Sequence, residues 1–311
     1  MLAVITCFYN PIGCQYRLAN YRCFHEQLKQ IGIPVYAVEL AFGEDKYVLN
    51  NNDATFLKQV RSKDFMFQKE RMLNLILEDV PEKYNEIVWM DCDVLYLEND
   101  WHKRTSELLK EHKVIQPYAY AVSLPSCKVS QVSYAYWVYY DCNGSGRLTR
   151  SFAHYASRRT NYATLHGGHL GYVWAARRDF LEKHKFYDPI ISGAGDLFMA
   201  MAFTGYLGWI DYQHELRLLS DRACVHFFEW AIPVLMETKG KVPYTVDQIV
   251  HLWHGDINTR NYLTSTQHLQ INNFDPTTDL RISENGCWEW NSKKPKLHAA
   301  MKDLFERQRI N

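Results

Sequence analysis

Two aspartates, Asp91 and Asp93, follow directly on an apolar segment of the chain, in the run Ile-Val-Trp-Met-Asp-Cys-Asp over residues 87–93. The bulky apolar residues of this run favour a buried strand. Two carboxylates at the end of a buried strand are costly unless a positive group meets them. A divalent cation that carries a phosphate ester is such a group. Because the bare Asp-x-Asp spacing arises about once by chance in a chain of this composition, the alternative interpretation is a solvated turn.

One lysine lies where an apolar residue is expected. The spacing predicts a helix from Ser62 to Val80 with an apolar stripe, and Lys69 falls on that stripe between Met66 and Leu73. A lysine in that place either extends its amine to solvent past the apolar surface or meets an anion. Taken alone, the first interpretation is favoured, so Lys69 matters only together with the carboxylates.

A third carboxylate, Asp196, follows the turn Gly193-Ala194-Gly195 and precedes an apolar helical run. An Asp at a helix start is often an N-cap. The helix dipole also keeps such a carboxylate ionised, which a base that removes a hydroxyl proton requires. Asp196 is therefore our candidate catalytic base, with capping as the alternative.

Two further segments carry histidine and glycine. In the segment His-Leu-Trp-His-Gly-Asp, His254 and His251 compete as a third metal ligand beside the aspartates. We favour His254, because Gly255 lets the backbone come near a site, and a core histidine is the competing interpretation. The segment over 166–171 has three glycines, which allow the backbone to approach a ligand closely or simply mark a bulged strand.

Strand-like and helical segments alternate over the first hundred residues. Strands are expected at Leu2–Cys7, Val35–Leu40 and Ile87–Met90, and helices at Arg17–Ile31 and Ser62–Val80. This alternation predicts a largely parallel sheet with helices on its faces, and ligands of such sheets bind at the carboxyl ends of the strands. After residue 254 we expect irregular chain and then a helix at Lys296–Arg309.

Bulk composition limits the class of protein. The 311 residues include 47% hydrophobic residues and equal numbers, 35 each, of basic and acidic residues. A net charge of zero argues against a protein that acts on nucleic acid. We expect one catalytic domain, with a nucleotide-sugar-binding half over about 1–100, an acceptor-binding half over 101–255 and an extension over 256–311. No signal peptide or membrane span is expected, so we predict a cytoplasmic protein with reduced cysteines.

These motifs, in this order, resemble a glycosyltransferase of the GT-A fold of the bacterial and viral type. Asp91 and Asp93 match the family's Asp-x-Asp motif. The family's glycine-rich turn with an acidic residue is matched by Gly193, Gly195 and Asp196. His251 or His254 matches the late histidine that completes the family's metal site. The resemblance implies a Rossmann-like, mixed and mainly parallel sheet flanked by helices. It also implies a nucleotide-sugar donor, with a UDP-sugar favoured, Mn²⁺ or Mg²⁺, and a glycan or other hydroxyl acceptor. By analogy, Thr6, Phe8 and Asn10 would contact the nucleoside of the donor. Asp93 would hold the metal directly, and Asp91 would reach the ribose or, through water, the metal. Lys69 completes the expected donor-binding set.

The resemblance implies an inverting transfer in which Asp196 deprotonates the acceptor. Gly195 stands where inverting relatives commonly carry Glu, so a retaining reaction stays open. Two other activities are alternatives: transfer to modified nucleic acid, using the basic patch from Arg147 to Arg159, and metal-dependent hydrolysis of phosphoesters. The sequence does not name the sugar, the acceptor or the oligomeric state.

Overall fold

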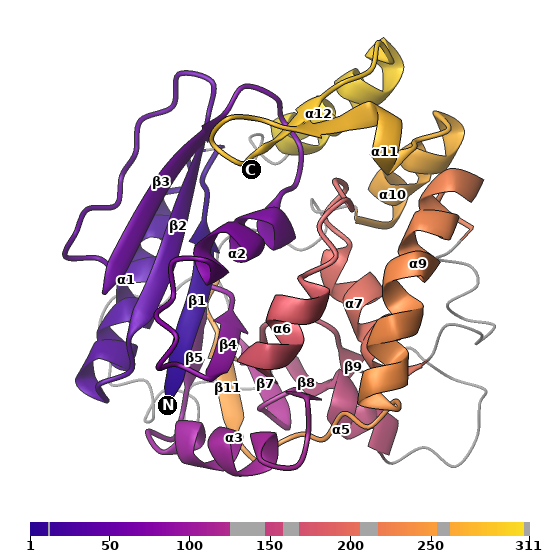
Figure 1. The fold of residues 1–311 in the computed structure, drawn as a ribbon. Helices are drawn as coiled ribbons and strands as arrows, with labels where there is room; N and C mark the ends of the chain where they lie inside the picture. The colour runs from indigo at the N-terminus through magenta and orange to yellow at the C-terminus, as the bar shows by residue number, and fades with distance from the viewer. Residues whose placement is uncertain (12, 125–146, 158–167, 206–216, 254–261, 308–311) are drawn as a thin grey trace.

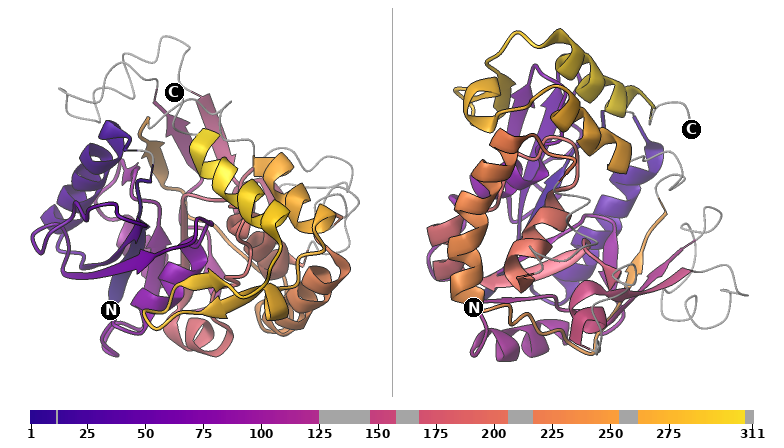
Figure 2. Two further views of the ribbon diagram at one scale, coloured as in Figure 1. Left: turned by 90° about the horizontal axis from the view of Figure 1, so that it is seen from above. Right: turned by 90° about the vertical axis from the view of Figure 1, so that its right-hand side faces the viewer.

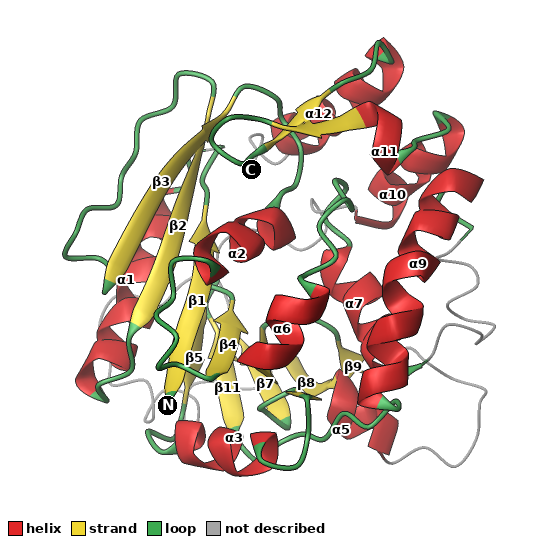
Figure 3. Ribbon diagram, viewed as in Figure 1, coloured by secondary structure: helices red, strands yellow, loops and turns green. Residues whose placement is uncertain are grey.

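A computed structural model describes residues 1–11, 13–124, 147–157, 168–205, 217–253 and 262–307. Two sheets form the centre of the molecule, and helices cover them (Figure 3).

The first sheet has six strands in the order β3-β2-β1-β4-β10-β6. Its strands are β1 (Leu2–Phe8), β2 (Val35–Phe42), β3 (Phe56–Ser62), β4 (Glu86–Met90), β6 (Val114–Ile115) and β10 (Val173–Arg177). The first four in this order pair in parallel, whereas β10 pairs antiparallel with both neighbours. The order 3-2-1-4 is that of a Rossmann-type sheet.

Apolar side chains bury both faces of this sheet. Every residue of β1 and β2 is buried, as expected for parallel strands covered on both sides. Alternate residues of β1 point to two separate cores: Ala3 and Ile5 belong to one, and Leu2 and Val4 to the other. One core includes α2 (Lys69–Leu77), α6 (Arg178–His184), α7 (Gly195–Thr204) and α9 (Asp221–Thr238), as Figure 1 shows. The other includes α1 (Gln15–Gln30) and strands of the second sheet.

The second sheet has five strands in the order β5-β11-β7-β8-β9. Its strands are β5 (Val94–Tyr96), β7 (Tyr120–Ser123), β8 (Arg147–Ser151), β9 (Gly168–His169) and β11 (Gln248–His251). The short helices α3 (Trp101–Leu109) and α5 (Phe152–Ser157) lie near its strands. The turn Asp91-Cys92-Asp93 carries the chain from β4 of the first sheet into β5 of the second. Both sheets therefore contribute to the region around the two aspartates.

Between residues 262 and 294 the chain is folded rather than irregular, so that expectation is wrong there, whereas the helix expected at Lys296–Arg309 is confirmed over Pro295–Arg307. The C-terminal part of the chain contains α10 (Tyr262–Ile271), α11 (Pro276–Asp279), β12 (Leu280–Ile282), β13 (Trp288–Trp290) and α12 (Pro295–Arg307). These elements pack together at one end of the molecule (Figure 2). Strands β12 and β13 pair as an antiparallel hairpin. This hairpin contacts the residues before α2: the backbone N–H of Trp288 donates to Gln68 at 2.6 Å, and that of Trp290 donates to Asp64 at 2.9 Å.

The prediction of a mixed, mainly parallel α/β fold flanked by helices is confirmed. The helix predicted over Ser62–Val80 is too long at its start, because Ser62 ends strand β3 and α2 begins at Lys69. As an edge strand, β3 exposes one side to water and tolerates Lys58 and Arg61. These charged residues interrupt the apolar run by which a strand is recognised in the sequence. Within the described ranges, no helix is both long and apolar enough to cross a membrane.

Candidate functional site

Three charged side chains from three separate elements meet at the carboxyl end of β4. Lys69 is the first residue of α2, Asp91 directly follows β4, and Asp196 is the second residue of α7. The amine Nζ of Lys69 donates to Oδ1 of Asp91 at 3.1 Å and to the two carboxylate oxygens of Asp196 at 3.0 and 2.8 Å. Of the two interpretations of Lys69, extension of its amine to solvent or contact with an anion, the structure shows the second. The anions are two of the predicted carboxylates.

Asp196 does not act as the N-cap of α7. Ala194 occupies the N-cap position, where no side-chain hydrogen bond caps the helix. Both oxygens of Asp196 are instead bound by Lys69. The capping interpretation is thus not what the structure shows, whereas the role of Asp196 as a base stays a prediction.

The start of α2 is fixed against the segment that leads into α7. The backbone N–H of Phe67 donates to the carbonyl of Ile191 at 3.0 Å. One turn into the helix, Asn74 donates to the carbonyl of Phe186 at 3.0 Å and accepts from its N–H at 2.8 Å. The start of α2 and the segment before α7 are far apart in sequence but lie side by side in the structure. This arrangement brings Lys69 within reach of Asp196.

The surrounding charges keep Lys69 protonated. Burial by itself would lower the pKa of Lys69, but the negative charges of Asp196 and Asp91 outweigh burial and raise it well above its ordinary value. Burial also raises the pKa of Asp91, and the positive charge of Lys69 opposes that rise. The lysine is thus a fixed positive charge in a site where carboxylates are in excess.

The second sheet brings His251 beside Asp93. In the register of this sheet His251 is opposite Val94, and the backbone N–H of Leu252 donates to the carbonyl of Asp93 at 2.8 Å. Nε2 of His251 consequently lies 3.7 Å from Oδ2 of Asp93. An imidazole and a carboxylate are side chains that bind divalent transition metals.

Tyr172 packs beside both aspartates and was not among the predicted site residues. Its carbonyl accepts the backbone N–H of Asp91 at 2.8 Å. Its ring stacks on His169 with centroids 3.6 Å apart and lies 4.8 Å from that of His251. Its φ is +75°, a conformation that non-glycine residues adopt at a cost. No spacing pattern in the sequence indicates such a conformation.

Two glycines of the glycine-rich segment lie close to other parts of the protein, whereas a close approach to a ligand stays a prediction. A Cβ atom added at Gly171 would lie 2.9 Å from Oδ2 of Asp196. A Cβ atom added at Gly168 would lie 2.6 Å from the Cα of Phe152. Residues 166 and 167 lie outside the described residues. Gly171 thus leaves room for the carboxylate of Asp196.

Glu70 is a further acidic residue of the site that the sequence reasoning missed. It is only 4% exposed, and its carboxyl group lies against Gly195. Burial is the largest cause that raises its pKa, to about 8; the charge of Lys69 opposes the shift and that of Asp196 adds to it. At neutral pH the protonated form therefore predominates. Its only signal in the sequence is its place next to Lys69 within the predicted helix.

The raised pKa of Glu70 makes stability depend on pH. Between about pH 4.5 and 8 the unfolded chain releases this proton and the folded chain retains it, so the free energy of unfolding falls as pH rises, by at most about 1.4 kcal/mol per unit. Glu70→Gln has no such proton. We expect the difference in stability, wild type minus variant, to decrease across this window in urea titrations. Parallel pH profiles of the two proteins would contradict the assignment.

The three residues predicted to contact a nucleoside lie on or just after β1. The hydroxyl of Thr6 is fully buried and donates to the carbonyl of Met90 at 2.7 Å. Phe8 is 1% exposed within the core that faces α1. Asn10 makes two hydrogen bonds of 2.9 Å with the backbone of Cys14. Their contact with a nucleoside stays a prediction.

The structure describes three of the four candidate metal ligands. Asp93 and His251 face each other, Asp91 contacts Lys69, and His254 lies outside the described residues. In the described part of the chain no three His, Cys, Asp or Glu side chains converge on one point as ligands of an ion. The chemistry of Asp93 and His251 nevertheless fits Mn²⁺, which accepts carboxylate and imidazole together.

Separate substitutions distinguish the two histidines. If His251 is a ligand, His251→Ala weakens Mn²⁺ binding about ten- to a hundred-fold, the usual loss when a metal shell is disturbed. The earlier preference for His254 predicts the same loss in His254→Ala instead. Calorimetric titration of Mn²⁺ into each variant measures both. Unchanged Mn²⁺ affinity in both variants would remove the late histidines from the site.

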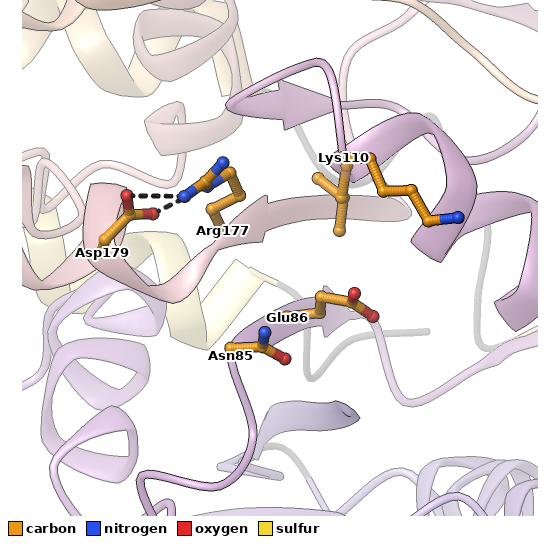
Figure 4. A pocket seen from close by; sticks show the side chains of 6 residues that line it. Asn85, Glu86, Lys110, Arg177 and Asp179 are labelled. Atoms are coloured by element: carbon orange, nitrogen blue, oxygen red, sulfur yellow. Dashed lines mark hydrogen bonds and ion pairs between the residues drawn. The ribbon is translucent and has the colours of Figure 1, made fainter.

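A cavity of about 290 Å³ lies at the opposite end of β4 from Asp91. It is lined by Asn85, Glu86, Leu109, Lys110, Arg177 and Asp179. Figure 4 shows that Arg177 points at Asp179, and the two make hydrogen bonds of 3.0 and 3.1 Å. Because Glu86 begins the strand that Met90 ends, this cavity is separate from the cluster around Lys69.

No protein-family model and no curated protein matches the chain. Among solved structures it is similar to Staphylococcus aureus TarS in complex with UDP-GlcNAc, with a TM-score of 0.39, 11% identity and coverage of 99% of this chain and 81% of that one. It is also similar to the catalytic domain of Drosophila β1,4-galactosyltransferase 7 in complex with xylobiose, with a TM-score of 0.31 and 13% identity over 64% of this chain. The alignment covers 58% of that chain, less than two thirds of its length.

A third similar structure is a putative glucose-1-phosphate thymidylyltransferase from Bacillus anthracis, with a TM-score of 0.35, 9% identity and coverage of 92% of this chain and 99% of that one. TM-scores and identities at this level do not establish an activity for this chain.

Proposed function

We propose that the protein is a metal-dependent glycosyltransferase that moves a sugar from a nucleotide-diphosphate sugar, with a UDP-sugar favoured, to a hydroxyl group of a glycan or another acceptor. The observation that carries the proposal is the bridge from Lys69 to Asp91 and Asp196. It joins the end of the Asp-x-Asp strand to the start of the helix that holds the candidate base. A strand end of this kind is where sheets of this type bind nucleotides.

The charges of Asp91, Asp93, Asp196 and Lys69 are compatible with a diphosphate donor that binds together with a metal ion. Asp91, Asp93 and Asp196 carry more negative charge than Lys69 balances, so a second cation is favoured there. In the proposal, Mn²⁺ or Mg²⁺ is held by Asp93 and a late histidine, His251 or His254, with Asp91 beside them. When bound, the ion supplies positive charge against the diphosphate leaving group.

The protein's own residues have two roles in the transfer. Asp196 accepts the proton of the acceptor hydroxyl, for which one of its oxygens must be shared between Lys69 and that hydroxyl. Lys69 keeps its proton and holds the carboxylate of Asp196 in a fixed orientation. A base at this place supports inversion at the sugar carbon, because the hydroxyl then attacks from the face opposite the leaving group.

Donor binding tests the proposal. Calorimetric titration of UDP-sugars in the presence of Mn²⁺ is expected to show binding by the wild type, and both EDTA and Asp93→Ala are expected to abolish it. Asp79→Ala is the matched control, because Asp79 pairs with Lys58 at 2.6 Å on another part of the molecule. Donor affinity that is the same with EDTA and in Asp93→Ala would refute metal-dependent binding at this site.

A further inference from the structure

The first two residues of α2 and the first two of α7 face each other in a crossed arrangement. Lys69, the first residue of α2, binds Asp196, the second residue of α7. Glu70, the second residue of α2, lies against Gly195, the first residue of α7. The two contacts are adjacent along both helices, so a change in one alters the geometry of the other.

The contact between Glu70 and Gly195 leaves no room for a side chain. A Cβ atom built at Gly195 would lie 2.3 Å from Cδ and from Oε1 of Glu70, and 2.6 Å from Oε2. Real Cβ atoms do not approach other atoms within 3.0 Å. The φ of Gly195 is not in the left-handed region, so space rather than backbone conformation requires glycine here. The carboxyl group of Glu70 therefore fills the volume that any other residue at 195 would need.

The residues on both sides of Glu70 are anchored. Its side chain is buried, and Gln68 just before it is fixed by hydrogen bonds to Ser62 at 3.1 Å and to Trp288 at 2.6 Å. Arg71 just after it donates to the carbonyl of Gly286 at 2.6 Å. The helix start that carries Glu70 is thus anchored on both sides, so the carboxyl group can move only by rotation of its own buried side chain.

We propose that Glu70 is a positioning residue of the site, whose carboxyl group sets the approach of α7 and thereby the placement of Asp196 against Lys69. The kinetic consequence rests on the proposed function, whereas the placement does not. Because Glu70 is mainly protonated at neutral pH, its amide counterpart Gln has nearly the same shape and charge. Shape at this position, rather than negative charge, is what the proposal requires.

Three variants test the proposal: Glu70→Gln, Glu70→Ala and Gly195→Ala. The first readout needs no substrate. Acetic anhydride labels free lysine amines, and mass spectrometry compares the labelling rate of Lys69 with that of Lys58, whose ion pair is elsewhere. We expect Glu70→Ala and Gly195→Ala to raise labelling of Lys69 several-fold and to leave Lys58 unchanged, with Glu70→Gln like the wild type.

The second readout is hydrolysis of the nucleotide sugar. A misplacement of about 1 Å costs up to about a hundred-fold in rate, so Glu70→Ala and Gly195→Ala are expected to lower kcat about ten- to a hundred-fold with little change in the donor KM. Glu70→Gln is expected to have the kcat of the wild type. A merely structural role predicts loss of folded protein without this split between kcat and KM.

The outcomes separate the two proposals. If wild-type protein hydrolyses no nucleotide sugar but labelling of Lys69 follows the expected pattern, the proposed function fails and the positioning role stands. If Gly195→Ala folds with unchanged labelling of Lys69, the positioning role is refuted, even where Glu70→Ala does not fold. Labelling raised in Glu70→Gln as much as in Glu70→Ala also refutes it, because the shape is then not what matters.

Discussion

Lys69→Met is expected to reduce donor turnover at least about a hundred-fold and to lower the free energy of unfolding by about 2 kcal/mol. The variant leaves the carboxylates of Asp91 and Asp196 facing each other without their shared cation, and a partly buried charged group that loses its partner costs about 1–3 kcal/mol or more. The orientation of Asp196 is lost at the same time. Donor hydrolysis and urea unfolding measure the two effects on the same preparations.

Lys58→Met is the matched control for this experiment. Lys58 donates to Asp79 at 2.6 Å, is also partly exposed, and lies on strand β3. An exposed ion pair of this type contributes about 0–1 kcal/mol, so this variant is expected to keep wild-type turnover. Equal turnover in the wild type and in Lys69→Met would contradict the role given to the lysine.

Asp196→Asn is expected to lower transfer by about two to four orders of magnitude, the usual share of a general base, with donor affinity little changed. The amide keeps the size of the carboxylate and removes the proton acceptor. Because Asp196 binds Lys69 through both oxygens, some stability is lost as well, by about 1 kcal/mol. Kinetics of transfer and calorimetric donor binding separate the two effects.

Asp79→Asn removes a carboxylate from the Lys58 pair and is the control for general effects of charge. Near-normal transfer by Asp196→Asn would exclude Asp196 as the base. So would a product that keeps the anomeric configuration of the donor, because retention does not require a base that activates the acceptor.

The sequence predicted three of the six strands of the first sheet, β1, β2 and β4, because their apolar residues are consecutive. Leu2–Phe8 and Glu86–Met90 are buried on both faces, and such strands are visible as unbroken apolar runs. The strand Phe56–Ser62 was not predicted, because an edge strand needs apolar residues on one side only. The C-terminal hairpin is short, and its contact with Gln68 joins residues that no local pattern connects.

Individual site residues could be named, but their contacts could not be predicted. Lys69 was singled out because it interrupts an apolar stripe, yet its partner Asp196 is 127 residues away. Glu70 gave almost no signal, since acidic residues at helix starts are common. Its importance comes from the absence of a side chain at Gly195, a distant position that only the packing of α2 against α7 connects to it.

The most direct test of the account is a screen of nucleotide sugars with Mn²⁺ that measures the released nucleoside diphosphate, using wild-type protein and Asp93→Ala prepared in the same way. The account predicts that the wild type consumes one donor, that EDTA stops the reaction, and that the variant releases no more nucleoside diphosphate than a blank. No release from any donor, or equal release by the wild type and Asp93→Ala, would contradict it.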